Sequence, residues 1–533
     1  MTVRKNRGKS APRTEEEAIA ELAELPAVHG AESRAADIVA QEVLVGKYRY
    51  SPVLGWLEWD ERHWVVDETG SDRAKEVIRQ FIDQQEQHYR KLAAGRDAEA
   101  VDAGRQADMW HNFLSAGKIS AIASLCKRMD GIVTRTSELD SHPDLLNCHN
   151  GVVDLRTGEL LPPDPDLLLT HLAGGNYTPG ATSPTWGKAL ESVHPEILDW
   201  FQVRTGQAAT GYPPDDDAMI VSIGGGENGK TGVMTGITRA LGTYANQISD
   251  RVLMSQPGQH PTELMDLRGL RLALLEETPE EGRLDTHRLK ATVGTPKIKA
   301  RLMRQDSVTF DASHTMFVNT NFTPQVDSVD HGTWRRLHGM PWPYRYLKPG
   351  QQAENENDRP GDLTLKPRLQ TEQAVIEAAL AWIVEGAKQW YKANRISPQP
   401  PQAVVDATAE WRARSDVGFQ FATDRLVASP NHFITAEAMR KEFCAFLTEQ
   451  GKREWSATTI NTRLPESLAA AKIFVTATPS KNAKVRQGDE RSTPDGINWE
   501  SHGPAPATGA QVRMWRGVRF RTSAEQGHLR AVR

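Results

Sequence analysis

Eight consecutive residues have the types and spacing that bind phosphate groups: Gly224, Gly225, Gly226, Glu227, Asn228, Gly229, Lys230 and Thr231. Glycines let the backbone turn tightly, so that several N–H groups point toward one anion, and a following helix adds its positive dipole. In this pattern the lysine reaches the β- and γ-phosphates and the threonine hydroxyl is a ligand of Mg²⁺. An ordinary glycine-rich turn is the alternative. The apolar run at 218–223 and the helix-forming run at 232–241 favour a site for a nucleoside triphosphate, with ATP and Mg²⁺ as the expected cofactors.

A second apolar run, at 270–277, ends in two acids 46 residues after Lys230. A carboxylate at the end of a strand near bound phosphates can hold Mg²⁺ through water, and another can polarise the attacking water. We assign the first role to Glu276, with Thr231 as the other magnesium ligand, and the second role to Glu277. Apolar runs that end in two glutamates are common, so the assignment depends on the preceding phosphate loop.

Two further polar groups follow in the same order along the chain. The run at 314–321 predicts a strand ending at Asn321, whose amide could contact the γ-phosphate or the attacking water. A capping or turn asparagine is the alternative. Arg335 and Arg336 come 105 and 106 residues after Lys230. An arginine from a neighbouring subunit can stabilise charge on a transferred phosphoryl group, although an Arg-Arg pair alone is usually a solvated surface.

Composition limits the class of protein that holds these residues. The chain has 533 residues, enough for two to four domains, and its 64 basic and 69 acidic side chains nearly balance. A nucleic-acid partner must therefore be met by local basic patches. Three cysteines without C-x-x-C spacing argue against a disulfide framework or a zinc ribbon. We find neither a signal peptide nor an apolar run of 18 residues, so we expect a cytoplasmic protein, in a bacterial host cell, with no membrane partner.

The elements expected around the motifs divide the chain into four parts. Residues 1–34 are predicted to be a disordered basic tail. Residues 35–200 are predicted to be an α+β accessory domain with a hairpin at 54–66, helices at 72–96 and 107–129, and a small β-meander at 145–160. The ATPase unit is expected at 201–395, with a polar loop at 347–362 and an amphipathic helix at 369–393. A basic C-terminal domain follows at 403–533, with helical patterns to about 470.

The order of the motifs resembles that of superfamily 3 helicases, specifically the helicase part of the phage, plasmid and poxvirus primase-helicase family. The glycine-rich loop with Asn228 before Gly-Lys, the acidic strand end, Thr-Asn followed by Pro324 and then Trp-Arg-Arg carry this resemblance. It implies an α/β fold with a P-loop AAA+-like core, assembled as a homo-oligomeric ring, a hexamer, with ATP between subunits. Asn321 then matches the sensor, and Arg336, with Arg335 as second choice, matches the arginine finger.

The family also places a DNA-contacting hairpin between the acidic strand and the sensor. The run at 297–310 fits it, because basic and apolar residues alternate around a polar turn. Lys297, Lys299, Arg301 and Arg304 would then contact phosphates of single-stranded DNA in a central pore without reading bases. An edge strand protected by charges is an equally good interpretation of each residue.

The C-terminal part carries a local excess of positive charge, 17 Lys and Arg against 10 Asp and Glu from residue 425. Helices expected at 436–450 and 456–471, followed by a late strand at 512–520, predict a winged-helix-like module for duplex DNA. Ser456 would cap the second helix, and Arg463, Arg516 and Arg519 are the candidate DNA contacts. A protein-docking module is the alternative.

These features together predict an ATP-dependent DNA helicase of a phage or mobile-element replication system, which translocates on single-stranded DNA as a ring. An ATP-dependent DNA remodeller or loader, and an origin-binding scaffold whose ATP controls assembly, are the alternatives. About 35 residues precede the matching region, and the carboxylate pair Asp164/Asp166 lies in a proline-rich loop. We therefore expect no primase activity in the chain and a separate primase or polymerase as partner.

Overall fold

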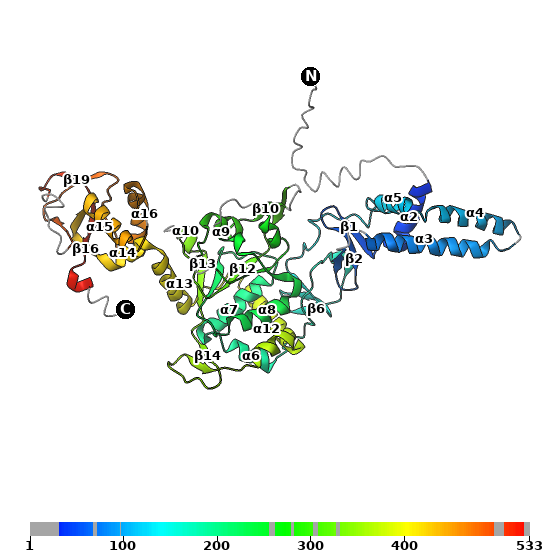
Figure 1. Cartoon of the computed structure of the whole chain (residues 1–533), viewed down its shortest axis with the longest axis horizontal. Coiled ribbons are helices and arrows are strands. Elements are labelled where there is room, and N and C mark those ends of the chain that lie inside the picture. Colours follow the sequence, from blue (N-terminus) through cyan, green and yellow to red (C-terminus); the bar gives the residue numbers. More distant parts are fainter. Residues whose placement is uncertain are drawn as a thin grey trace, which may run out of the picture.

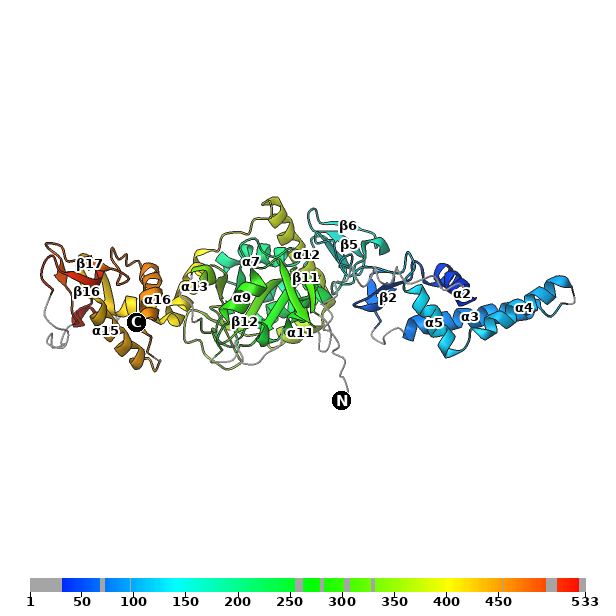
Figure 2. The same cartoon turned by 90° about the horizontal axis from the view of Figure 1, so that it is seen from above.

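The computed structural model of the chain describes residues 31–67, 72–95, 97–254, 262–278, 282–301, 307–326, 331–452, 454–494 and 506–526. The chain is elongated: a helical N-terminal part and a C-terminal part lie at opposite ends of a central sheet (Figures 1 and 2). Arg304 lies outside the described residues. Among the described residues, no helix is both long and apolar enough to cross a membrane.

The N-terminal part packs helices against a three-stranded antiparallel sheet, around buried residues such as Trp56 and Trp110. Its elements are α2 (Ala31–Val39), η1 (Ala40–Leu44), β1 (Tyr48–Ser51), β2 (Gly55–Trp59), β3 (Trp64–Val66), α3 (Asp72–Leu92), α4 (Ala98–Asn112) and α5 (Ala116–Cys126). The hairpin predicted at 54–66 is confirmed. The single helix predicted at 107–129 is wrong. Ser115 has an extended backbone at the start of α5, which ends the helical repeat of α4.

A second antiparallel sheet confirms the predicted meander and contains β4 (Leu145–Cys148), β5 (Gly151–Asp154) and β6 (Glu159–Leu161). Its first turn requires glycine. Gly151 has φ +146°, and a Cβ there would lie 2.3 Å from the Leu161 carbonyl oxygen. One-turn helix η2 (Pro165–Leu167) follows, and the Asp164 carboxylate accepts the Asp166 N–H at its start. This contact is a helix cap.

Five parallel strands form the central sheet in the order β13-β7-β12-β9-β8. They are β7 (Met219–Ile223), β8 (Ala245–Gln247), β9 (Leu272–Glu276), β12 (Thr315–Thr320) and β13 (Leu337–Pro341). Successive residues of β7 face opposite sides, with Ile220 in one apolar cluster and Met219 and Val221 in the other. Both faces of the sheet are therefore covered, which explains the continuous apolar runs in the sequence.

Helices and short elements cover the two faces and the ends of this sheet. They are α6 (Pro184–Leu190), α7 (Pro195–Ala208), α8 (Lys230–Leu241), η3 (Gly242–Tyr244), η4 (Asp250–Val252), η5 (Glu263–Leu267), α9 (Thr286–Val293), β10 (Lys297–Arg301), β11 (Ser307–Asp311), α10 (His331–Trp334), β14 (Arg345–Leu347), β15 (Asp358–Pro360), α11 (Leu365–Thr371) and α12 (Gln373–Lys392). The helix expected at 369–393 is two helices, because the extended backbone of Glu372 separates α11 from α12. The segment predicted as a loop at 347–362 contains β15, which pairs with β14.

The C-terminal part has its own apolar cluster, which includes Phe421, Phe443 and Trp515. Its elements are α13 (Gln402–Ser415), α14 (Val417–Arg425), β16 (Leu426–Thr435), α15 (Ala436–Glu449), α16 (Ala457–Ala470), β17 (Asn482–Lys484), β18 (Glu490–Arg491) and β19 (Gln511–Phe520). The helices predicted after residue 435 and the late strand are confirmed. The prediction of helical patterns from 403 to about 470 is wrong at β16. Pro430 cannot continue a helix, and distant β19 supplies the pairing for a strand.

Candidate functional site

The glycine-rich loop lies at the carboxyl end of β7 and leads directly into α8. Gly229 has φ +85° at the helix start, and a Cβ there would lie 2.2 Å from the Ser192 hydroxyl oxygen. A Cβ on Gly224 would lie 2.8 Å from the Trp342 carbonyl oxygen. Around Gly225 and Gly226, by contrast, such an atom would have nothing within 4 Å. The two outer glycines thus allow close packing of the loop, while the middle of the loop borders open space.

Lys230 connects this loop to the end of the neighbouring strand β12. Its side chain is buried, and Nζ donates to the Gly224 carbonyl oxygen at 2.5 Å and to the Thr320 carbonyl oxygen at 2.7 Å. It also donates to Asn321 Oδ1 at 3.1 Å. Burial lowers the pKa of Lys230 to about 8. Lys230 and Asn321 are 91 positions apart in the sequence, and the fold joins them by a hydrogen bond.

Asn228 is a buried side chain with one unused donor. Its Oδ1 accepts the Lys230 backbone N–H at 3.4 Å, but Nδ2 has no hydrogen-bond partner among the described residues. A buried amide without an acceptor costs about 1–3 kcal/mol. A phosphate oxygen in the loop would supply that acceptor. The loop and its asparagine therefore fit an anionic group.

The two candidate carboxylates differ in backbone geometry. Glu276 ends β9 and is paired in register with Asn319 of β12. Glu277 turns away with φ +61°, and its N–H donates to the Asn319 carbonyl oxygen at 2.9 Å. Its side chain is exposed, whereas that of Glu276 is half-buried. A left-handed backbone is uncommon outside glycine, so this turn is held by the neighbouring strand and sets the directions of the two acids apart.

Two side chains at this edge were not predicted from the sequence. Asn319 Oδ1 is buried and has no hydrogen-bond partner among the described residues. Thr278 Oγ lies 2.5 Å from Thr320 Oγ and donates to the Phe322 carbonyl oxygen at 2.6 Å, which joins the chain after β9 to the chain after β12. The alternation of side chains along β12 was the available signal. Thr231, predicted as a magnesium ligand, is exposed as the second residue of α8.

The arginine pair lies at the amino ends of the parallel strands, opposite the carboxyl ends that carry the loop. Arg336 directly precedes β13, and its carbonyl oxygen accepts the N–H of Met219, the first residue of β7. Both Arg335 and Arg336 donate from Nη2 to Asp217 Oδ2 at 3.0 Å. The side chain of Arg335 is 44% exposed and that of Arg336 only 12%. Within one chain, the fold therefore does not bring these residues to the loop.

The predicted basic hairpin is present as β10 and β11, which pair only with each other among the described strands. Lys297, Lys299 and Arg301 are exposed, and Ile298 and Ala300 between them are buried. One face of β10 is therefore cationic. Lys297 Nζ lies 3.9 Å from an Asp311 carboxylate oxygen on the partner strand, so part of its charge is compensated.

The C-terminal candidates differ in how far they are exposed. Ser456 caps α16 as predicted, because its hydroxyl accepts the Thr459 N–H. Arg463 is exposed on that helix. The side chain of Arg516 is only 5% exposed and pairs with Asp489 at 2.9 Å, so it is not an exposed cation, and its DNA contact stays a prediction. Arg519 is partly exposed and pairs with Glu525 at 2.7 Å, and its DNA contact stays a prediction.

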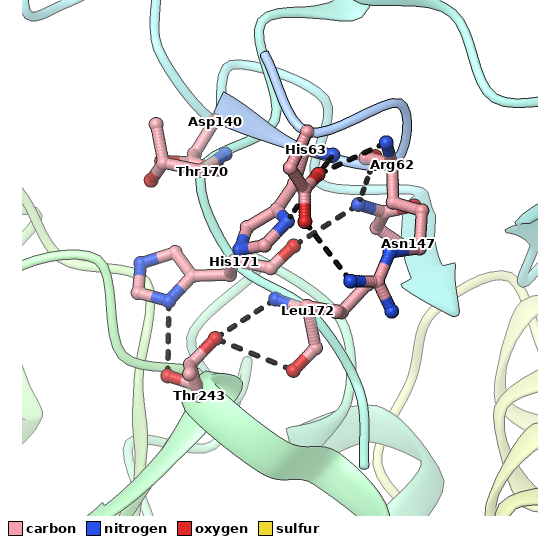
Figure 3. Close-up of polar contacts among 9 residues, drawn as sticks. Arg62, His63, Asp140, Asn147, Thr170, His171, Leu172 and Thr243 are labelled. Carbon is pink, nitrogen blue, oxygen red and sulfur yellow. Dashed lines mark hydrogen bonds and ion pairs between the residues drawn. The ribbon is translucent and has the colours of Figure 1, made fainter. Parts of the chain in front are cut away.

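A hydrogen-bonded joint connects residues 171–172, which follow η2, to the far end of α8 (Figure 3). Thr243 donates its N–H to the Leu172 carbonyl oxygen at 3.0 Å and accepts the Leu172 N–H through Oγ at 2.8 Å. His171 Nδ1 lies 2.9 Å from the Thr243 carbonyl oxygen. Burial holds the pKa of His171 below its usual value, which favours a neutral ring that donates from Nδ1. The helix that begins at the loop thus ends at this joint.

Sequence comparisons find similarity to viral proteins that are named as primases or helicases. Residues 36–195 match the family described as D5 N terminal like. A protein of African swine fever virus whose name proposes a primase is 26% identical over 404 residues, 70% of this chain and 40% of that protein. A protein of Acanthamoeba polyphaga mimivirus whose name proposes a helicase is 20% identical over 438 residues, 77% of this chain and 44% of that protein. The chain thus spans about two fifths of the length of these relatives.

A further relative, from Frog virus 3 and also named as a proposed helicase, is 26% identical over 231 residues, covering 42% of this chain and 23% of that protein. Among solved structures, the A-form apo structure of the NrS-1 C-terminal region aligns with a TM-score of 0.44 at 11% identity, over 91% of this chain and 98% of that one. The relatives carry both primase and helicase names, so their names do not separate the two activities. The predicted resemblance is confirmed: the chain is similar to proteins of large DNA viruses that are named as primases or helicases.

Proposed function

We propose that this chain is an ATP-dependent DNA helicase that assembles as a ring and translocates on single-stranded DNA. One observation carries the proposal: a glycine-rich loop, Lys230, Asn321 and two carboxylates meet at the carboxyl edge of one parallel sheet. Ligands of open α/β sheets bind at that edge. The buried Nδ2 of Asn228 and the open space around Gly225 support a phosphate group as the occupant.

The chain's own residues divide the work of hydrolysis. Lys230 would give up its hydrogen bonds with backbone carbonyls to bind the β- and γ-phosphates, and Thr231 with Glu276 would hold Mg²⁺. The ion supplies charge neutralisation of the phosphates. Glu277, turned away from its neighbour by its left-handed backbone, is the group that would orient and deprotonate the attacking water. Asn321, already bonded to Lys230, would report the presence of the γ-phosphate to β12.

The distance between the amino and carboxyl ends of the strands supports a site shared between subunits. Five residues of β7 separate the arginine pair from the loop, which is roughly 15 Å of strand. An arginine at the amino edge can therefore act on a nucleotide only if that nucleotide is bound by a neighbouring chain. This is the geometry that an AAA+-like ring needs, with each subunit supplying the loop to one interface and Arg335 or Arg336 to the other.

We assign the exposed cations of β10 to single-stranded DNA. Binding through phosphates alone would be tolerant of sequence and steeply dependent on salt. For duplex DNA, residues 417–520 have the order helix, strand, helix, helix and then three strands. This order and the capped α16 with exposed Arg463 support a winged-helix-like module. The primase or polymerase partner expected from the sequence stays a proposal.

The proposal is tested by nucleotide binding, ATP hydrolysis and strand separation on the full chain. Lys230→Ala should abolish ATP binding, because the loop has no other cation to replace the ammonium group. Joint replacement of Lys297, Lys299 and Arg301 by alanine should leave basal ATP hydrolysis intact. It should also lower the salt slope of single-strand binding by about 0.7 for each phosphate that the variant no longer neutralises. ATP hydrolysis without any strand separation would instead favour a DNA remodeller or loader.

A further inference from the structure

A pocket of about 590 Å³ opens in the C-terminal part, away from the nucleotide site. It lies between the irregular middle of β16, the chain that follows α16, the β17–β18 connection and β19. Its walls include Ser429, Asn431, Lys472, Phe474, Arg486 and Arg516. The volume is within the range of pockets that hold small organic ligands.

Phe474 is an exposed aromatic side chain on a fixed backbone. It is 72% exposed, although Ile473 beside it is buried in the apolar core. The chain around it is bonded to β19, because Thr476 donates its N–H to the Arg516 carbonyl oxygen at 2.8 Å and Arg516 donates its own to Ala477 at 3.1 Å. Such a ring loses little conformational freedom when another flat group stacks on it. The pocket therefore has a preformed stacking surface.

The charged groups of the pocket are mainly cationic. Lys472 and Arg486 are exposed, and the charged lining residues comprise these two, Arg516 and one acid, Asp489. Arg516 is 4% exposed, and its Nη2 donates to Asp489 and to the Lys484 carbonyl oxygen. Its Nε, however, is buried without a hydrogen-bond partner among the described residues. The cations that the pocket presents to a ligand are therefore Lys472 and Arg486.

We propose that this pocket binds an unstacked nucleotide of a single nucleic-acid strand. The base stacks on Phe474, and the flanking phosphates lie against Lys472 and Arg486. A base offers the flat π-face that an aromatic platform binds, and its phosphates match the positive lining. The C-terminal part would then hold a single strand at a site separate from the β10 hairpin, which would contact phosphates alone.

The test is the binding of the full chain, without ATP, to a fluorescent oligo-dT and to an abasic strand of equal length. Phe474→Ala should weaken binding to oligo-dT by about 5- to 160-fold and leave binding to the abasic strand unchanged, because only the former can stack. Phe474→Tyr keeps the ring and should bind oligo-dT like the wild type. Ile396→Ala, which also removes an exposed apolar side chain (59%), is the matched control and should change neither.

Two outcomes would overturn the inference: unchanged binding of oligo-dT by Phe474→Ala, or an equal loss of affinity for both strands. Phe474 is exposed, so its removal leaves no cavity, and circular dichroism checks that the variant is folded. Joint replacement of Lys472 and Arg486 by alanine should lower the salt slope by about 1.4 on both strands. The inference does not rest on ATP hydrolysis, so failure of the ATPase proposal would leave this result interpretable.

Discussion

Mixing two inactive variants tests the intersubunit site most directly. Lys230→Ala removes the cation of the loop, and Arg336→Ala removes the proposed finger at the opposite edge of the sheet. Neither variant alone should hydrolyse ATP at more than a residual rate. In a ring assembled at random, a site is complete when an intact loop from one variant meets an intact arginine from the other. An equal mixture should therefore recover about a quarter of the wild-type sites.

Steady-state ATP hydrolysis is measured as the mixing ratio varies at constant total protein. We expect activity to rise from both pure variants to a maximum near equal amounts. Because Arg336 is mostly buried against Asp217, Arg335→Ala, at the more exposed position, is run in parallel and identifies which arginine acts. Thermal unfolding of each variant controls for disruption of the shared ion pair. If activity follows the weighted average of the two variants at every ratio, the arginines do not act between subunits and the reasoning is refuted.

Three other side chains give further predictions. Glu277→Gln should bind ATP normally but hydrolyse it at least ~10²-fold more slowly in a single-turnover assay, and near-normal turnover would move the base elsewhere. Bound phosphate favours the charged form of the Lys230 ammonium group, whose pKa is about 8 in the free protein. The affinity for ATP, measured by calorimetry, should therefore fall as pH rises above about 8. Lys230→Arg should show no such dependence on pH. For the same reason the unfolded chain, with a lysine pKa of 10.5, binds more protons than the free folded protein between pH 8 and 10.5, so this group should make the free energy of unfolding rise with pH there. Arg516→Ala should lower the free energy of unfolding by about 3–5 kcal/mol in a denaturant titration, because it leaves the Asp489 carboxylate buried and unpaired, and a change below about 0.5 kcal/mol would contradict the buried pair.

The sequence alone was sufficient wherever the information is local. The strand, loop and helix around Lys230 are encoded by glycines and apolar residues within about 25 positions. The alternation of charge and apolar residues at 297–301 predicted the exposed and buried sides of β10, and Ser456 predicted the start of α16. In each case the backbone period or a cap determines the outcome, so distant residues have little influence.

Tertiary structure decided what depends on pairing between distant segments. Local patterns could not show that Arg335 and Arg336 lie at the sheet edge opposite the loop, because that follows from the register of β13 with β7. Nor could they separate Arg516, buried against Asp489, from Arg519, which is partly exposed on the same strand. The burial of a charged side chain depends on the partner that the fold places beside it, and here that partner lies 27 residues away in the sequence.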